Sequence, residues 1–135
     1  MWNPRTLVVC VLLVLSAGIA DAKEKAPFVT LMTHDSFAVS QALLDDFQKQ
    51  TGAEIKILKS GDAGAALNQA ILSRKNPLAD VFFGVDNTFM SRALSAGVFE
   101  PYESPFLKDI PGALKLDSSH RLLPVDYGDV CLNYD

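Results

Sequence analysis

The chain has 135 residues, 49% of them hydrophobic, with a formal net charge of -4 at pH 7 and a sequence pI of about 5.0. This length and apolar content suffice for one domain with its own core. The acidic balance, without a basic stripe, argues against nucleic acid as a partner and suits a cationic small ligand better than an anionic one.

The first 22 residues have the parts of a secretory signal peptide. Arg5 supplies a positive charge, residues 7–17 are apolar but too few for a comfortable membrane span, and Ala20 and Ala22 fit the small-x-small cleavage rule. We predict export with cleavage after Ala22; a retained N-terminal anchor is the alternative. Cleavage would leave Cys131 as the one cysteine, which cannot form an internal disulfide.

The first predicted strand covers residues 28–32 and is followed by the polar run His34, Asp35 and Ser36. Asp35 or Ser36 is expected to cap a helix that ends at Gly52. The apolar positions of this helix are Val39, Leu43, Leu44 and Phe47.

A second strand is predicted around residues 55–58, where neighbouring charged residues indicate an exposed edge. The small-residue loop 60–64 follows, and then a helix over residues 65–75 that carries Ala66, Leu67, Ala70 and Ile71 on one face. Such a loop lets backbone N–H groups approach a ligand, although Asp62 could equally cap an ordinary turn into the helix.

The third predicted strand, residues 81–83, is a continuous apolar run that favours burial on both faces in a parallel sheet, and the chain is organised around it. Asp86 and Asn87 follow it and are expected on a binding edge, with helix capping as the alternative. A helix over residues 88–96, closed by Gly97, comes next and is expected to turn Phe89, Ala93 and Leu94 inward.

The last part of the chain is predicted to be irregular over residues 98–110, with short strands at residues 122–125 and 130–134. The chain stops at the end of an apolar strand, and unpaired strand edges invite association. We therefore expect the sequence to be a fragment of a longer one.

The sequence shows no catalytic motif and no metal-binding motif. The two histidines, His34 and His120, belong to no metal-spaced cluster, and neither a nucleophile elbow nor a nucleotide-binding loop is present. His34, Asp35 and Ser36 are adjacent, so they cannot adopt the geometry of a hydrolytic triad. We expect no enzyme activity, no cofactor and no metal site.

Polar groups follow successive predicted strands, and in a parallel sheet such groups meet at one edge. Four carboxylates and an aromatic ring there would suit an organic cation through charge-assisted hydrogen bonds and cation–π contact. The members are His34, Asp35, Asp62, Asp86, Asn87, Asp126 and Tyr127.

Five segments together resemble the thiamine-binding periplasmic proteins of ABC importers. The segment around Asn76 to Val81 is shared more widely, with ferric-iron and other solute-binding relatives. The segments at residues 33–37, 84–87 and 124–128 are more specific to the thiamine branch. Family members often carry Tyr in place of His34 and Gly in place of Ala63. The resembling segments are residues 33–37, 62–68, 75–81, 84–87 and 124–128.

The resemblance implies an α/β fold: a periplasmic-binding-protein-like lobe with a mostly parallel sheet flanked by helices, the second lobe missing. Residues 1–22 would be the signal peptide and residues 23–135 the incomplete first lobe of a periplasmic protein. It would capture thiamine or thiamine phosphates and deliver the vitamin to a membrane permease. The implied ligand-binding residues are His34, Asp35, Ser36, Asp62, Ala63, Asp86, Asn87, Asp126 and Tyr127.

Two alternatives stay open from the sequence. Within the same class, the solute could be ferric iron or a polyamine. From another class, the chain could be a fragment of an exported hydrolase whose catalytic residues lie beyond Asp135.

Overall fold

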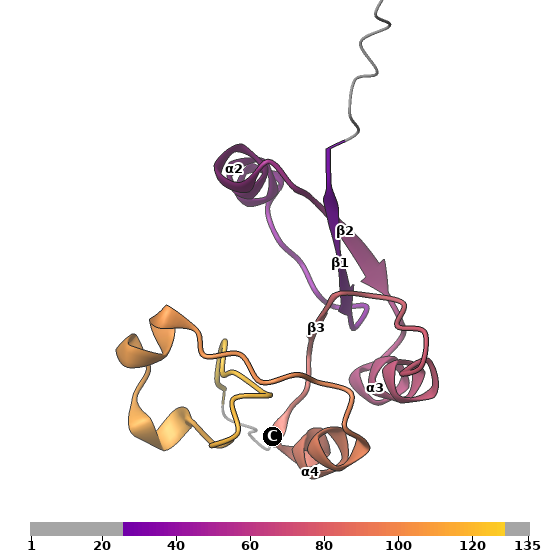
Figure 1. The fold of residues 1–135 in the computed structure, drawn as a ribbon, viewed down its shortest axis with the longest axis vertical. Coiled ribbons are helices and arrows are strands. Elements are labelled where there is room, and N and C mark those ends of the chain that lie inside the picture. Colours follow the sequence, from indigo (N-terminus) through magenta and orange to yellow (C-terminus); the bar gives the residue numbers. More distant parts are fainter. Residues whose placement is uncertain (1–25, 129–135) are drawn as a thin grey trace, which may run out of the picture.

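The computed structural model describes residues 26–128 and shows a parallel sheet with helices, followed by a long irregular segment (Figure 1). The predicted signal peptide, the strand at residues 130–134 and Cys131 lie outside the described residues. In chain order the elements are β1 (Phe28–Thr33), α2 (Gln41–Thr51), β2 (Glu54–Lys59), α3 (Ala63–Leu72), β3 (Val81–Phe83), α4 (Asn87–Ala96) and two 3-10 helices, η1 (Pro105–Asp109) and η2 (Gly112–Leu114).

The sheet has the strand order β2-β1-β3, and β1 pairs in parallel with both neighbours. The predicted parallel α/β architecture and the edge position of β2 are confirmed. The prediction of a strand at residues 81–83 is confirmed, but the prediction that it is buried on both faces is wrong. Within the described sheet β3 is an edge strand that pairs only with β1, and the Val81 side chain is 50% exposed. The strand at the centre is β1.

Asp80 fastens the short strand β3 to β1. Its backbone N–H donates to the Thr30 carbonyl oxygen at 2.9 Å, and its carboxylate accepts from the Thr30 N–H at 2.8 Å. These two bonds extend the ladder past Val81, so a strand of three residues gains further hydrogen bonds to the centre of the sheet.

Helix α2 begins later than the sequence indicates. Ser40 is its N-cap and accepts from the Leu43 N–H, whereas Asp35 and Ser36 precede the helix, so the predicted cap is wrong. Leu43, expected to face inward, is 60% exposed. The predicted end is confirmed, since Gly52 adopts the left-handed conformation that closes the helix.

Helices α3 and α4 lie side by side, and α2 lies apart from them with the strands between (Figure 1). The predicted inward positions of α3 and α4 are confirmed at Ala66, Leu67 and Ala93, which are buried together with Met32 of β1. Helix α3 starts two residues before the predicted boundary and ends three residues earlier, at Leu72.

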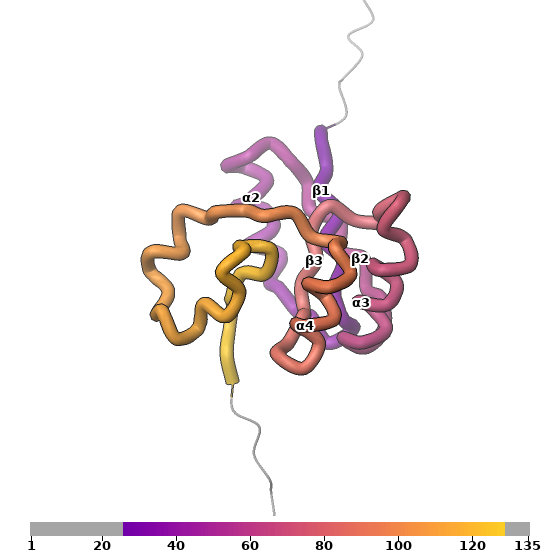
Figure 2. Tube along the Cα trace, turned by 60° about the horizontal axis from the view of Figure 1, so that its bottom comes forward, coloured from indigo at the N-terminus to yellow at the C-terminus, as the bar shows by residue number. Residues whose placement is uncertain are grey.

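Residues 98–128 form an arm beside this α/β unit, coloured orange to yellow in Figure 2. The predicted strand at residues 122–125 is wrong, because the N–H of Leu122 donates to the Asp117 carboxylate within a tight turn and Pro124 has no N–H to offer. Among residues 26–128, none of the helices has the length and apolar character needed to cross a membrane.

Candidate functional site

The three strands end at one level, and this edge carries most of the predicted site. The register pairs Thr33 at the end of β1 with Lys59 at the end of β2 and with Phe83 at the end of β3. The residues that follow, starting at His34, Ser60 and Gly84, therefore leave the sheet beside one another. In α/β sheets ligands bind at this carboxyl edge.

The loop after β1 is tied to the loop after β2. The Asp35 N–H donates to the Gly61 carbonyl oxygen at 2.8 Å, and the Gly61 N–H donates back to the Asp35 carboxylate at 3.1 Å. The ammonium group of Lys59 donates to the Asp35 carbonyl oxygen at 2.8 Å. One Asp35 oxygen is thus used structurally, and a positive charge lies next to the predicted carboxylate cluster.

Asp62 and Asp86 are helix caps, as their alternative interpretation held. Asp62 accepts from the Ala65 N–H at 2.7 Å, and Asp86 accepts from the N–H groups of Thr88 and Phe89 at 2.9 and 3.0 Å. Each cap uses one oxygen, and within residues 26–128 the second oxygen of each carboxylate has no partner. Capping therefore leaves both groups one acceptor for a ligand.

The first turn of α3 also has unused donors. Asp62 supplies the acceptors at this helix start: its carboxylate accepts from the Ala65 N–H, and its carbonyl oxygen accepts from the Ala66 N–H. The N–H groups of Ala63 and Gly64 have no acceptor within the described part of the chain. Free N–H groups at a helix start favour anions and neutral acceptors. The edge therefore offers carboxylate oxygens and amide donors side by side.

His34 lies within an aromatic cluster at the same edge. Its ring centroid is 5.9 Å from that of Phe83, and Phe37 packs on Phe83 at 4.9 Å. The glycine at position 84 has a φ of +117°, and a Cβ atom there would lie 2.7 Å from Cδ2 of His34. The half-buried imidazole therefore rests against a backbone that only glycine permits.

Two buried hydroxyl oxygens lie at these strand ends without a partner among residues 26–128. They are Oγ1 of Thr33 and Oγ of Ser60. A buried hydroxyl without a hydrogen bond costs about 1 to 3 kcal/mol of stability. Each hydroxyl can therefore accept a hydrogen bond from water or from a ligand that enters this edge.

The structure brings together most of the predicted site residues but not all of them. His34, Asp35, Asp62, Ala63, Asp86 and Asn87 lie on the carboxyl edge, and Ser36 is exposed on the loop after β1. The predicted strand before Asp126 and Tyr127 does not form in the described residues, and both side chains are exposed on the arm, Tyr127 to 82%. Their place at the edge stays a prediction.

Sequence reasoning overlooked three residues of this edge. Lys59 was interpreted only as a sign of an exposed strand, and neither Phe37 nor Gly84 was assigned a role in the site. The available signal was the glycine two positions before a helix-capping aspartate, since a glycine at a strand end marks close backbone approach.

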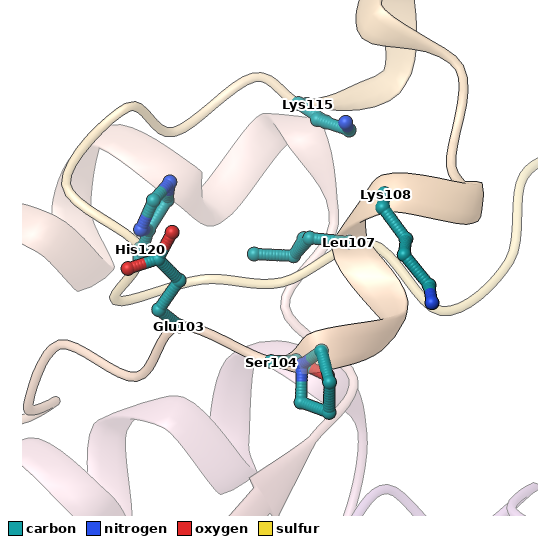
Figure 3. A pocket seen from close by; sticks show the side chains of 7 residues that line it. Glu103, Ser104, Leu107, Lys108, Lys115 and His120 are labelled. Carbon is teal, nitrogen blue, oxygen red and sulfur yellow. The ribbon is translucent and has the colours of Figure 1, made fainter.

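A separate hollow lies in the arm. It has a volume of about 530 Å³ and is lined by Glu103, Ser104, Pro105, Leu107, Lys108, Lys115 and His120. Figure 3 shows Glu103 beside His120 on one side and the two lysines on the other, with Leu107 between them. The lining comes from turns and one 3-10 helix and contains none of the predicted site residues. Sites held by strands and helices are better fixed, so the strand edge is the stronger candidate.

No group of three His, Cys, Asp or Glu side chains in residues 26–128 is arranged to hold a metal ion. The edge can bind through hydrogen bonds, charge and ring contact.

No family model matches the chain. It is similar to curated thiamine-binding periplasmic proteins, with 32% identity over 130 residues to that of Salmonella typhimurium and 29% over 124 residues to that of Brucella suis. These matches cover 92% and 87% of this chain but 38% and 36% of the relatives, so the chain spans little more than a third of their length. The relatives support the predicted periplasmic location.

Solved periplasmic binding proteins have a similar fold. A Trichodesmium protein in complex with iron and citrate aligns with a TM-score of 0.60 and 28% identity, covering 70% of this chain and 29% of that protein. The ferric binding protein of Campylobacter jejuni aligns with a TM-score of 0.57 at 20% identity, which supports the fold alone. The fold prediction is confirmed. The relatives are solute-binding proteins rather than enzymes, in agreement with the expectation of no catalysis.

Proposed function

We propose that this chain, a relative of the thiamine-binding periplasmic proteins with the fold of a periplasmic binding protein, forms one wall of the solute site in the receptor of an ABC importer. The receptor would capture thiamine or a thiamine phosphate and deliver it to a membrane permease. The observation that carries the proposal is that β1, β2 and β3 end at the same level of the sheet. The loops that follow them therefore bring a ring, carboxylates and free amide donors to one edge.

The chemistry of the edge suits a ligand with both a cationic ring and acceptor atoms. The unpaired oxygens of Asp62 and Asp86 can face a thiazolium charge, while the free N–H groups of Ala63 and Gly64 can face a pyrimidine nitrogen or a phosphate. His34 offers a ring face for stacking. Asp35, Ser36 and Asn87 would complete the polar rim from the neighbouring loops.

Asp126 and Tyr127 are less well supported as ligand-binding residues than the residues of the strand edge. Both are exposed on the arm and follow no strand of the described sheet. Segment rearrangement around a ligand is common in receptors of this fold class.

Ferric iron is the second candidate solute, favoured by the Trichodesmium protein whose structure contains iron and citrate. Iron would need several anionic or imidazole ligands, which the described edge offers only as separated carboxylates and one histidine. Citrate, by contrast, would match the free amide donors of α3.

Calorimetric titration of the complete gene product decides between these solutes. Thiamine and thiamine monophosphate are titrated in parallel with ferric citrate and spermidine, at two salt concentrations. We expect saturable 1:1 binding of thiamine or its phosphate, weakened by salt because charges contribute. Binding of ferric citrate alone would favour the second candidate, and binding of none of the four would refute the receptor proposal for these solutes.

A further inference from the structure

Gly84, which follows β3, lies directly against the imidazole ring of His34, which follows β1. The φ of Gly84 is +117°, outside the range that side chains accept readily, and a Cβ atom there would lie 2.7 Å from Cδ2 and 3.6 Å from Nε2 of His34. Two properties of position 84 thus require glycine: its backbone conformation and the space taken by the imidazole.

The imidazole also belongs to an aromatic cluster. Its ring centroid lies 5.9 Å from that of Phe83 with an interplanar angle of 38°, and Phe83 is held in turn by Phe37 at 4.9 Å. Phe83 is the last residue of β3 and Gly84 follows it, so the end of one strand provides both neighbours of the histidine. His34 follows β1, whose register with β3 sets this meeting.

We propose that Gly84 is a positioning residue that fixes the imidazole ring of His34 at the carboxyl edge and thereby sets which flat ligand ring can stack there. The proposal deepens the proposed function and rests on it for the choice of ligand. Gly84 need not touch the ligand, because it acts through the ring of His34. A methyl group at position 84 would push the ring away from the backbone and tilt its exposed face.

The test combines NMR of the imidazole groups with thiamine titration, using Gly84→Ala in the complete gene product. Gly97→Ala is the matched control, because Gly97 also has a positive φ, +61°, yet a Cβ atom there would meet nothing within 4 Å. Of the two histidines in this chain, His120 lies in the arm and serves as an internal reference.

In the wild type we expect a nuclear Overhauser effect between Hδ2 of His34 and the Hα protons of Gly84. Gly84→Ala should shift the imidazole signal of His34 and leave that of His120 in place. It should weaken thiamine binding about two- to tenfold, the range of one aromatic contact. Gly97→Ala should change neither quantity. In a His34→Ala background, Gly84→Ala should change affinity by less than about twofold, because the ring it displaces is absent.

Any one of three results overturns the proposal: no Overhauser effect in the wild type, no shift of the His34 signal in Gly84→Ala, or a loss of affinity in Gly84→Ala that is equal with and without the His34 ring. If Gly84→Ala does not fold, the double variant with His34→Ala must fold; if it also fails, glycine serves backbone conformation alone. Should the wild type not bind thiamine, the proposed function fails, and the two NMR measurements still decide whether Gly84 positions the ring.

Discussion

Replacing Asp86 separates the two roles that its carboxylate has in the proposed receptor. One oxygen caps α4 by accepting from the Thr88 and Phe89 N–H groups, and the other is available to a cation. Asp86→Asn keeps an acceptor oxygen for the cap but removes the charge. Asp86→Ala removes both the acceptor and the charge.

The two variants should rank differently in stability and in affinity. Loss of the cap in Asp86→Ala costs about 0.5 to 2 kcal/mol of unfolding free energy. Asp86→Asn should cost less than about 1 kcal/mol, the loss of a favourable charge at the helix start. For binding, loss of a charge-assisted hydrogen bond is worth about 1.5 to 3 kcal/mol, or roughly tenfold to a hundredfold in affinity. Because Asp86 is exposed in this structure, the lower end is expected.

The assay is calorimetric titration of thiamine into the complete gene product, with chemical denaturation of the same samples. Asp45→Asn is the control, since Asp45 is an exposed carboxylate on α2 that accepts from the Gln41 side chain and lies off the strand-end edge. Both Asp86 variants should bind thiamine more weakly than wild type, whereas Asp86→Asn should stay nearly as stable as wild type. If Asp86→Asn binds like wild type, the carboxylate is only a cap and the site assignment is wrong. The same series at Asp62 should behave alike.

Three further predictions concern export, sheet stability and pH. The exported protein should begin at Lys23, and mass spectrometry that finds Met1 retained would contradict the predicted cleavage. Asp80→Ala should lower the unfolding free energy by about 1 to 3 kcal/mol, because it leaves the Thr30 N–H without its 2.8 Å acceptor; denaturation equal to wild type would show that water replaces this bond. The Ser119 hydroxyl, followed by backbone N–H groups, lowers the pKa of Asp117 from 3.8 to about 2. Its stabilisation of the turn should therefore be complete above pH 3.8 and vanish as the pH falls through about 2, whereas an amide of Leu122 that titrates near 3.8 by NMR would refute the assignment.

Local signals in the sequence predicted the elements that depend on neighbouring residues. Helix α4 was expected over residues 88–96 and is found from Asn87 to Ala96, because Asp86 caps it and Gly97 closes it in the left-handed conformation. The inward face of α3 was also predicted, since its apolar residues recur at helical spacing. Both outcomes rest on contacts within a few residues of the chain.

Contacts between distant residues could not be predicted in this way. Asp35, Ser36 and Ser40 are all suitable caps, and the bond between Asp35 and Gly61, which are 26 residues apart, decides that Asp35 serves the loop instead. The apolar run 81–83 fits a central strand and an edge strand equally well. Strand order depends on how the crossovers pass the sheet, which no local pattern records.

The candidate site shows the same division. The carboxyl edge itself followed from the strand–loop–helix pattern, so six of the nine predicted residues lie on it. The contact between His34 and Gly84 depends on the register between β1 and β3, so it could be identified only in the structure.

The position of β1 between its two partners has a consequence for the order in which the molecule acquires its shape. Bonds at the β1–β2 side join residues 26 apart, whereas those between β1 and the start of β3 join residues 50 apart. Closing the longer loop costs more chain entropy, so the β1-α2-β2 unit is expected to form first and β3 to dock onto it afterwards. The docking of β3 also brings Gly84 against His34 and Asp86 to the edge, so the wall of the site is incomplete until β3 has docked. A ligand that binds this wall stabilises the state in which β3 is docked. Adding the ligand should therefore slow amide hydrogen exchange in β3 more than in β2.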